Sequence, residues 1–142
     1  MKKLFSLILI AATIIVLMPV KASAATDEDI LLGYINGARE QAGLTALTVD
    51  AELTKAAQVR AQESRMKFSH TRPDGAPFYS VSVAVNAENL AAAHSYNTLE
   101  EVFSVWMSSP SHKANILYPS STKTGFGIYK ADDMYYVAEE FD

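Results

Sequence analysis

The sequence contains no cysteine. It therefore has no disulfide, no thiol nucleophile and no cysteine metal ligand, and it has no cysteine that could carry a lipid at an export junction. Without disulfides, a secreted domain of this sequence depends on its hydrophobic core for stability. After residue 24 there is also no apolar run long enough to cross a bilayer.

Basic residues are few and scattered. The chain has 12 Lys and Arg against 16 Asp and Glu, a formal net charge of -4. Without a basic cluster, nucleic acid and anionic lipid headgroups are poor partners. The sequence also lacks a Gly-x-Ser-x-Gly elbow and a phosphate-binding glycine loop, which argues against a serine hydrolase and a nucleotide-binding protein.

The N-terminus has the pattern of a secretory signal peptide. Two lysines precede the apolar run Leu4 to Val20, and Ala22-Ser23-Ala24 forms a small-x-small cleavage pattern. An uncleaved membrane anchor is the alternative, which Pro19 disfavours because it breaks the helix just before that pattern. We predict a signal peptide over residues 1–24 and one secreted, extracellular domain over residues 25–142, with cell-surface association left open.

The hydrophobic pattern of the predicted domain places helices and strands in separate blocks. Helical spacing predicts one helix over residues 27–42, a second after Asp50, a third opening at Thr98 with a capping box to Glu101, and a short fourth starting at Ser109-Pro110. Alternating residues predict a short strand over 79–85 and two antiparallel strands over 124–129 and 134–141. Separate blocks of this kind favour an α+β fold with an antiparallel sheet.

Three polar residues carry most of the chemistry of the chain: His70, Glu88 and His112. Two imidazoles and a carboxylate are the ligand set of an open zinc site or the acid–base set of a hydrolase. Their spacing matches no local zinc motif. The alternative therefore stays open that His70 stabilises a helix end while the other two are ordinary surface residues. The third histidine, His94, lies in an alanine-rich stretch without a similar setting.

Five stretches, in this order, resemble the CAP superfamily of cysteine-rich secretory proteins, venom antigens and pathogenesis-related proteins. These stretches are Asn36–Arg39, Phe68–His70, Glu88–Ala91, Trp106–Leu117 and Gly125–Gly127. The likeness is closer to small bacterial secreted members, also called SCP-domain proteins. The resemblance implies a three-layer α-β-α sandwich with a central antiparallel sheet. It also implies a surface cleft in which His70, Glu88 and His112 meet, where several members bind zinc or another divalent ion.

The chain departs from the family pattern at two positions. The family has a second acid a few residues after the first histidine, and here only Asp74 offers a substitute. Glycine usually precedes the Glu-Asn pair, whereas this chain has Ala87, which would be strained if the backbone there needed a positive φ. Asn89 and Asn115 match family positions, and they serve either buried hydrogen bonding or ligand contact.

The resemblance favours a non-enzymatic extracellular binding module with a divalent-metal cleft. Zinc would be held by His70, Glu88 and His112, with no organic cofactor, and the partner would be a lipid, a glycan or a protein. One alternative is a zinc-assisted extracellular hydrolase or peptidase, which lacks a free general base once Glu88 is a ligand. The other is a purely structural surface protein in which the three residues form a hydrogen-bonded network.

Overall fold

A computed structural model describes residues 24–94 and 98–142, so nearly all of the predicted signal peptide lies outside the described residues. In chain order the elements are α1 (Asp27–Gln41), β1 (Thr48–Val49), α2 (Ala51–Met66), the 3-10 helix η1 (Phe78–Val81), β2 (Ala87–His94), α3 (Leu99–Ser108), α4 (Pro110–Ile116), β3 (Lys123–Ala131) and β4 (Met134–Phe141). None of the helices within these described ranges is long and apolar enough to cross a membrane.

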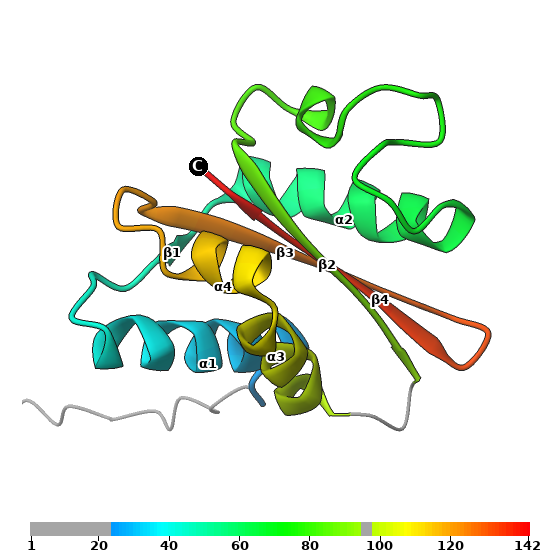
Figure 1. Cartoon of the computed structure of the whole chain (residues 1–142). Helices are drawn as coiled ribbons and strands as arrows, with labels where there is room; N and C mark the ends of the chain where they lie inside the picture. Colours follow the sequence, from blue (N-terminus) through cyan, green and yellow to red (C-terminus); the bar gives the residue numbers. More distant parts are fainter. Residues whose placement is uncertain (1–23, 95–97) are drawn as a thin grey trace, which may run out of the picture.

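The sheet has four strands in the order β1-β3-β4-β2 (Figure 1). The long strands β2, β3 and β4 are antiparallel, in agreement with the predicted antiparallel sheet, while the short β1 runs parallel to β3 and makes the sheet mixed. The β3–β4 hairpin turns at Asp132 and Asp133, whose φ values of 53° and 58° are the left-handed conformation of a tight type I′ turn. Strand β2 lies at the end of the sheet, with β4 as its neighbour.

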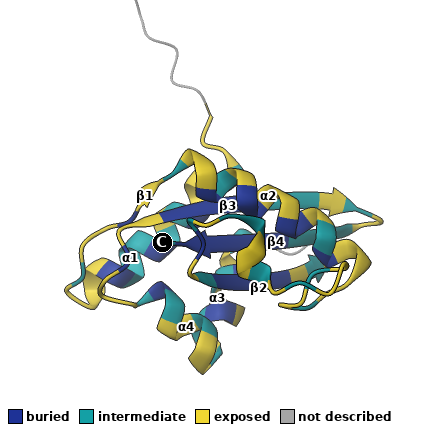
Figure 2. Ribbon diagram, turned by 90° about the horizontal axis from the view of Figure 1, so that it is seen from above, coloured by how far each residue is buried: buried dark blue, intermediate teal, exposed yellow. Residues whose placement is uncertain are grey.

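Helices cover both faces of the sheet and give three layers (Figures 1 and 2). On one face α1, α3 and α4 surround a core of large side chains that includes the fully buried Trp106 and Phe126. On the other face α2 packs through alanines, among them Ala57 and Ala61. The predicted α+β sandwich is therefore confirmed: of the α-helices in the described ranges, α2 covers one face and α1, α3 and α4 cover the other.

Two glycines of β3 let α2 approach the sheet closely. A Cβ added at Gly127 would lie 2.2 Å from the carbonyl oxygen of Ala57, and one at Gly125 would lie 2.1 Å from the backbone nitrogen of Thr54. Distances this short leave no room for a side chain, so the backbones of β3 and α2 are nearly in contact. This close contact fixes α2, which carries one side of the candidate site.

Hydrogen-bonding side chains fix the helix starts. Asp50 accepts from two backbone N–H groups of α2, and Thr98 forms a capping box with Glu101 at α3, so both predicted caps are confirmed. Helix α1 begins with a further capping box between Thr26 and Asp29. Each cap satisfies backbone donors that the first turn of a helix leaves unpaired.

Two polar residues of α1 serve hydrogen bonding inside the fold. The buried Arg39 donates to the carbonyl oxygens of Thr45, Ile116, Tyr118 and Ser121, at 2.8 to 3.0 Å. Asn36 exchanges two hydrogen bonds with the backbone of Leu47. These contacts tie α1 to the loop before β1 and to the segment that runs from α4 to β3.

The region before Glu88 differs from the prediction. The strand expected over 79–85 is wrong, since Phe78–Val81 forms a 3-10 helix there, and the main strand, β2, begins only at Ala87. Alternation in so short a segment does not separate a strand from a turn with packed side chains. Ala87 pairs with Phe141 and does not have a positive φ, so alanine is unstrained at this position.

Candidate functional site

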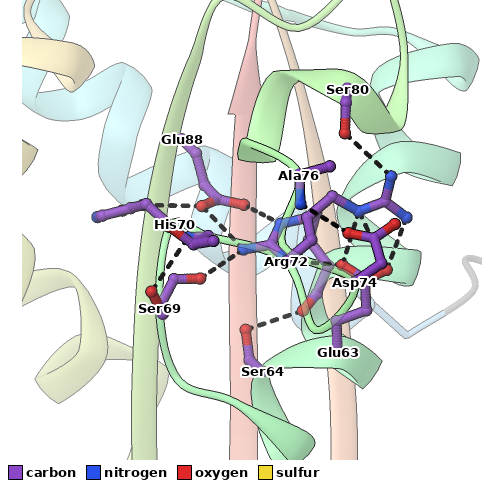
Figure 3. Close-up of polar contacts among 11 residues, drawn as sticks. Glu63, Ser64, Ser69, His70, Arg72, Asp74, Ala76, Ser80 and Glu88 are labelled. Carbon is purple, nitrogen blue, oxygen red and sulfur yellow. Dashed lines mark hydrogen bonds and ion pairs between the residues drawn. The ribbon is translucent and has the colours of Figure 1, made fainter.

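His70 and Glu88 meet at the end of α2. Nδ1 of His70 lies 2.8 Å from Oε1 of Glu88, and the His70 side chain is 55% exposed while that of Glu88 is fully buried (Figure 3). An ionised carboxylate accepts a hydrogen bond from an Nδ1–H group. The bond therefore favours the tautomer in which Nε2 of His70 carries a free lone pair.

Arg60 of α2 holds Glu88 from inside the molecule. Its Nε donates to Oε2 of Glu88 at 2.6 Å and its Nη2 donates to Oε1 at 3.2 Å, with both side chains fully buried. Nη2 also donates to the carbonyl oxygen of Ser69 at 2.7 Å. Burial lowers the pKa of Arg60, but hydrogen bonds and charge from Glu88 and Glu63 outweigh it and raise that pKa overall. One guanidinium thus fixes the carboxylate and the residue before His70.

Glu63 extends this ion-pair network into the loop after His70. Its carboxylate accepts from Nη1 of Arg60 at 2.6 Å and from Nη2 of Arg72 at 2.7 Å. Burial raises the pKa of Glu63, yet the two arginines outweigh burial and hold that pKa below its usual range. Arg72 also donates to the hydroxyl of Ser80. The loop that carries His70 is therefore held by a network of buried and partly buried charges (Figure 3).

Asp74, the predicted substitute for the missing acid, lies exposed in its own turn. Its Oδ1 accepts from the backbone N–H of Ala76 at 2.9 Å, the usual role of aspartate in a turn. The charged residues around His70 and Glu88 are instead Arg60 and Glu63. Arg60 lies on the buried stripe of α2, and the sequence alone assigned it no role. A charged side chain on such a stripe was the signal that could have identified it.

His112 comes to the site from α4. Its Nδ1 is buried and has no hydrogen-bond partner among the described residues. Burial, and then charge repulsion from His70, lower the pKa of His112. The imidazole therefore stays neutral at neutral pH and keeps a lone pair for a ligand.

Asn89 and Asn115 position His112 against β2. Asn89 donates through Nδ2 to the carbonyl oxygen of His112 at 3.2 Å, and Asn115 donates to Oδ1 of Asn89 at 2.9 Å and to the carbonyl oxygen of Glu88 at 3.2 Å. The structure thus brings His70, Glu88, His112 and both asparagines together. Buried hydrogen bonding is the use that both asparagines show.

Two further acids lie buried on β4, on opposite faces of the sheet. Burial raises the pKa of Glu139 to about 8, although Thr124 and Asn89 donate hydrogen bonds to it. Glu140 is the cross-strand neighbour of Glu88, and both of its oxygens are buried without a hydrogen-bond partner among the described residues. Burial and then the charge of Glu88 raise the pKa of Glu140 far above its usual range.

An open apolar groove of about 500 Å³ adjoins His112. Strand β2 lines it with Leu90–His94, α3 lines it with Val102 and Val105, and Phe68 lies at the end of α2. The histidine therefore lies at the boundary between the buried ion-pair network and an apolar surface hollow.

The three predicted metal ligands do not have equivalent surroundings in this structure. Within the described ranges, no group of three or more His, Cys, Asp or Glu is arranged to hold a metal ion. The oxygens of Glu88 accept from Arg60 and lie against His70, so in this arrangement Glu88 orients an imidazole. His70 and His112 keep nitrogens for a metal. Coordination by all three residues stays a prediction.

A family model described as the cysteine-rich secretory protein family, CAP, matches residues 32–141. The chain belongs to the CAP family. The YkwD protein of Bacillus subtilis (strain 168) is 31% identical over 122 residues, which are 80% of this chain and 47% of that protein. The CAP chain described here thus spans about half the length of this curated relative.

Solved structures share the CAP fold at low identity. An outer surface protein of Borrelia burgdorferi superposes with a TM-score of 0.68 at 24% identity, covering 87% of this chain and 97% of its own. NaASP2, solved with Zn²⁺, has a TM-score of 0.62 at 14% identity, covering 78% of this chain and 76% of its own. At these identities the likeness establishes the fold alone.

Proposed function

We propose that this chain is an extracellular binding module of the CAP family, whose cleft takes a divalent cation such as zinc on His70 and His112. Glu88 orients His70, and Arg60 keeps that carboxylate in place. The adjoining apolar groove contacts the partner. The ion contributes positive charge and open coordination positions that a partner's donor atoms can occupy.

The buried, unpartnered Nδ1 of His112 is the observation that carries this proposal. A buried polar atom without a partner is costly unless something binds it. Imidazole nitrogens are common zinc ligands, and the lowered pKa of His112 keeps this one neutral. His70 supplies a second imidazole, whose tautomer is set by the hydrogen bond between its Nδ1 and Glu88. NaASP2, a neighbour by fold, was solved with Zn²⁺.

The arrangement of acids favours binding over hydrolysis. A zinc-assisted hydrolase needs a carboxylate within reach of the attacking water to take its proton. Here Glu88 is held by Arg60 and His70, Glu63 is held by two arginines, and Asp74 bonds its own turn. None of these acids is free to act as a general base.

The extracellular location rests on the signal-peptide pattern of the first 24 residues. The Borrelia burgdorferi neighbour is an outer surface protein, which agrees with that location. This part of the proposal can be tested by mass spectrometry of the protein found outside the producing cell. We expect a mass that corresponds to a chain whose first residue is Ala25.

Zinc titration by calorimetry tests the metal site. We expect saturable binding of about one ion per chain that is lost in His70→Ala and in His112→Ala. His94→Ala removes the remaining histidine of the chain and is the matched control, which should bind as the parent does. An absence of binding, or binding that depends on His94 alone, would overturn the proposed site.

A further inference from the structure

The groove beside His112 runs along an open edge of the sheet. Strand β2 is the terminal strand, and its five consecutive residues Leu90–His94 line the groove. Odd and even positions of a strand point to opposite faces of the sheet, and residues of both kinds line the groove. The lining therefore includes the backbone edge of β2 as well as its side chains. The wall of this groove therefore includes main-chain hydrogen-bonding groups.

The hydrogen bonds around β2 identify which residues point outward. The carbonyl oxygen of Phe141 accepts from the backbone N–H of Asn86, so the odd residues of β4 face β2. Their partners in register include Asn89, Ala91 and Ala93. In an antiparallel ladder, residues alternate between pointing their N–H and C=O toward the partner strand and away from it. The even residues of β2 therefore direct these groups away from β4.

Two outward carbonyl groups confirm this alternation. The carbonyl oxygen of Glu88 accepts from Asn115, and that of Leu90 accepts from Nε1 of Trp106 at 3.0 Å. Side chains from α4 and α3 thus cover the first half of the edge. The next outward residue is Ala92, which is exposed, and no hydrogen bond in the described ranges reaches its outward N–H or C=O. An exposed strand edge of this kind is a template for another strand.

The walls of the groove fit apolar side chains. Val105 on α3 is 61% exposed and Phe68 at the end of α2 is 56% exposed, so apolar surface flanks the edge on both sides. Side chains of an added strand alternate between these two sides. Among the described residues that line the groove there is no Lys or Arg, whereas Glu101 is one of them. This charge distribution, in a chain of net charge -4, disfavours an anionic occupant.

We propose that the groove binds an extended, apolar peptide segment of neutral or positive charge, which adds to β2 as a further strand beside Ala92. The side chains of Trp106 and Asn115 stop the pairing at Leu90, so one end of the peptide lies beside His112. This inference rests on the proposed binding function and names its partner class. It does not require the metal ion.

The proposal can be tested with a library of capped hexapeptides whose positions vary among valine, leucine, isoleucine, threonine and lysine. The library is titrated into the purified, isotope-labelled protein in the presence of a chelator, and amide signals are followed by NMR. We expect selected peptides to shift the Leu90 and Ala92 amides and to slow their hydrogen exchange.

Two substitutions at one position separate backbone pairing from simple contact. Ala92→Pro removes an outward N–H and leaves the β2–β4 ladder intact, so we expect peptide binding to weaken about tenfold or more while the melting temperature changes little. Ala92→Ser keeps the N–H and is the matched control, which should bind as the parent does. Val105→Asp should weaken binding by placing a charge in the apolar wall.

Three results would overturn the proposal. One is a library in which no peptide shifts the Leu90 and Ala92 amides. Another is Ala92→Pro binding peptide as tightly as Ala92→Ser. The third is saturable binding of a neutral alkyl glycoside in the groove when peptides fail to bind, which would make the groove an alkyl-chain site. Because all arms contain a chelator, a failure of zinc binding does not affect them.

Discussion

Arg60 and Glu88 form a fully buried ion pair in which two guanidinium nitrogens bond both carboxylate oxygens, at 2.6 and 3.2 Å. Removing one partner of such a pair leaves an uncompensated buried charge. We expect Arg60→Met to lower the free energy of unfolding by about 3–5 kcal/mol, measured by urea denaturation. Arg65→Met is the matched control. Arg65 lies on the same helix as Arg60 but forms an exposed ion pair with Asp132. Its replacement should lower the free energy of unfolding by about 1 kcal/mol or less. Equal losses in the two variants would contradict the assigned role of Arg60.

Buried acids make the stability of the fold depend on pH. Burial raises the pKa of Glu139 from an ordinary value of 4.5 to about 8, so the folded state keeps a proton that the unfolded state releases. The stability due to this proton is fully present below pH 4.5 and is lost as pH rises through about 8. The raised pKa of Glu140 acts in the same direction.

Within that window we expect the free energy of unfolding to fall by up to about 1.4 kcal/mol per pH unit for each such group. Denaturation curves at several pH values from 5 to 8 measure this slope. Glu139→Gln carries no titrating proton and should flatten it. The lowered pKa of His112 acts in the opposite direction, so the slope of the parent protein is compared with that of Glu139→Gln. Equal slopes in the two proteins would show that Glu139 is ionised in the folded protein.

Zinc affinity should fall in acid. Histidine must be neutral to bind a metal, so we expect binding to weaken by about tenfold or more between pH 7 and pH 5.5. Calorimetry at three pH values measures the change, with His94→Ala as a control that should follow the parent protein. Affinity that is constant over this range would contradict coordination by His70 and His112.

The contact between β3 and α2 predicts a strong effect of one methyl group. In Gly127→Ala the new Cβ would overlap the backbone of Ala57, so we expect a loss of about 1–3 kcal/mol or more. Gly33→Ala on the exposed side of α1 meets no atom within 4 Å and should stabilise by about 0.5–1 kcal/mol. Thermal unfolding compares the two variants. If Gly127→Ala is neutral, α2 does not pack on β3 as closely as described.

Local signals in the sequence predicted much of the fold. Helical periodicity and the caps at Asp50 and Thr98 predicted helices that the structure confirms, because capping and amphipathic spacing depend on residues one turn apart. The C-terminal hairpin was also predicted from a local signal, since the alternation of side chains along a strand depends on neighbouring residues. Strand β2 was not predicted as a strand, since its core is a run of small residues whose pairing with β4 is decided by distant sequence.

The sequence by itself determined the family, the absence of cysteine chemistry and the three residues around which the site is built. Those properties follow from residue identity and local order. Only the tertiary structure decided that Arg60 neutralises Glu88, that His112 is buried without a partner, and that β2 leaves an open edge beside it. These features depend on elements far apart in the chain, since burial changes the energy of a charge only once the surrounding layers have packed.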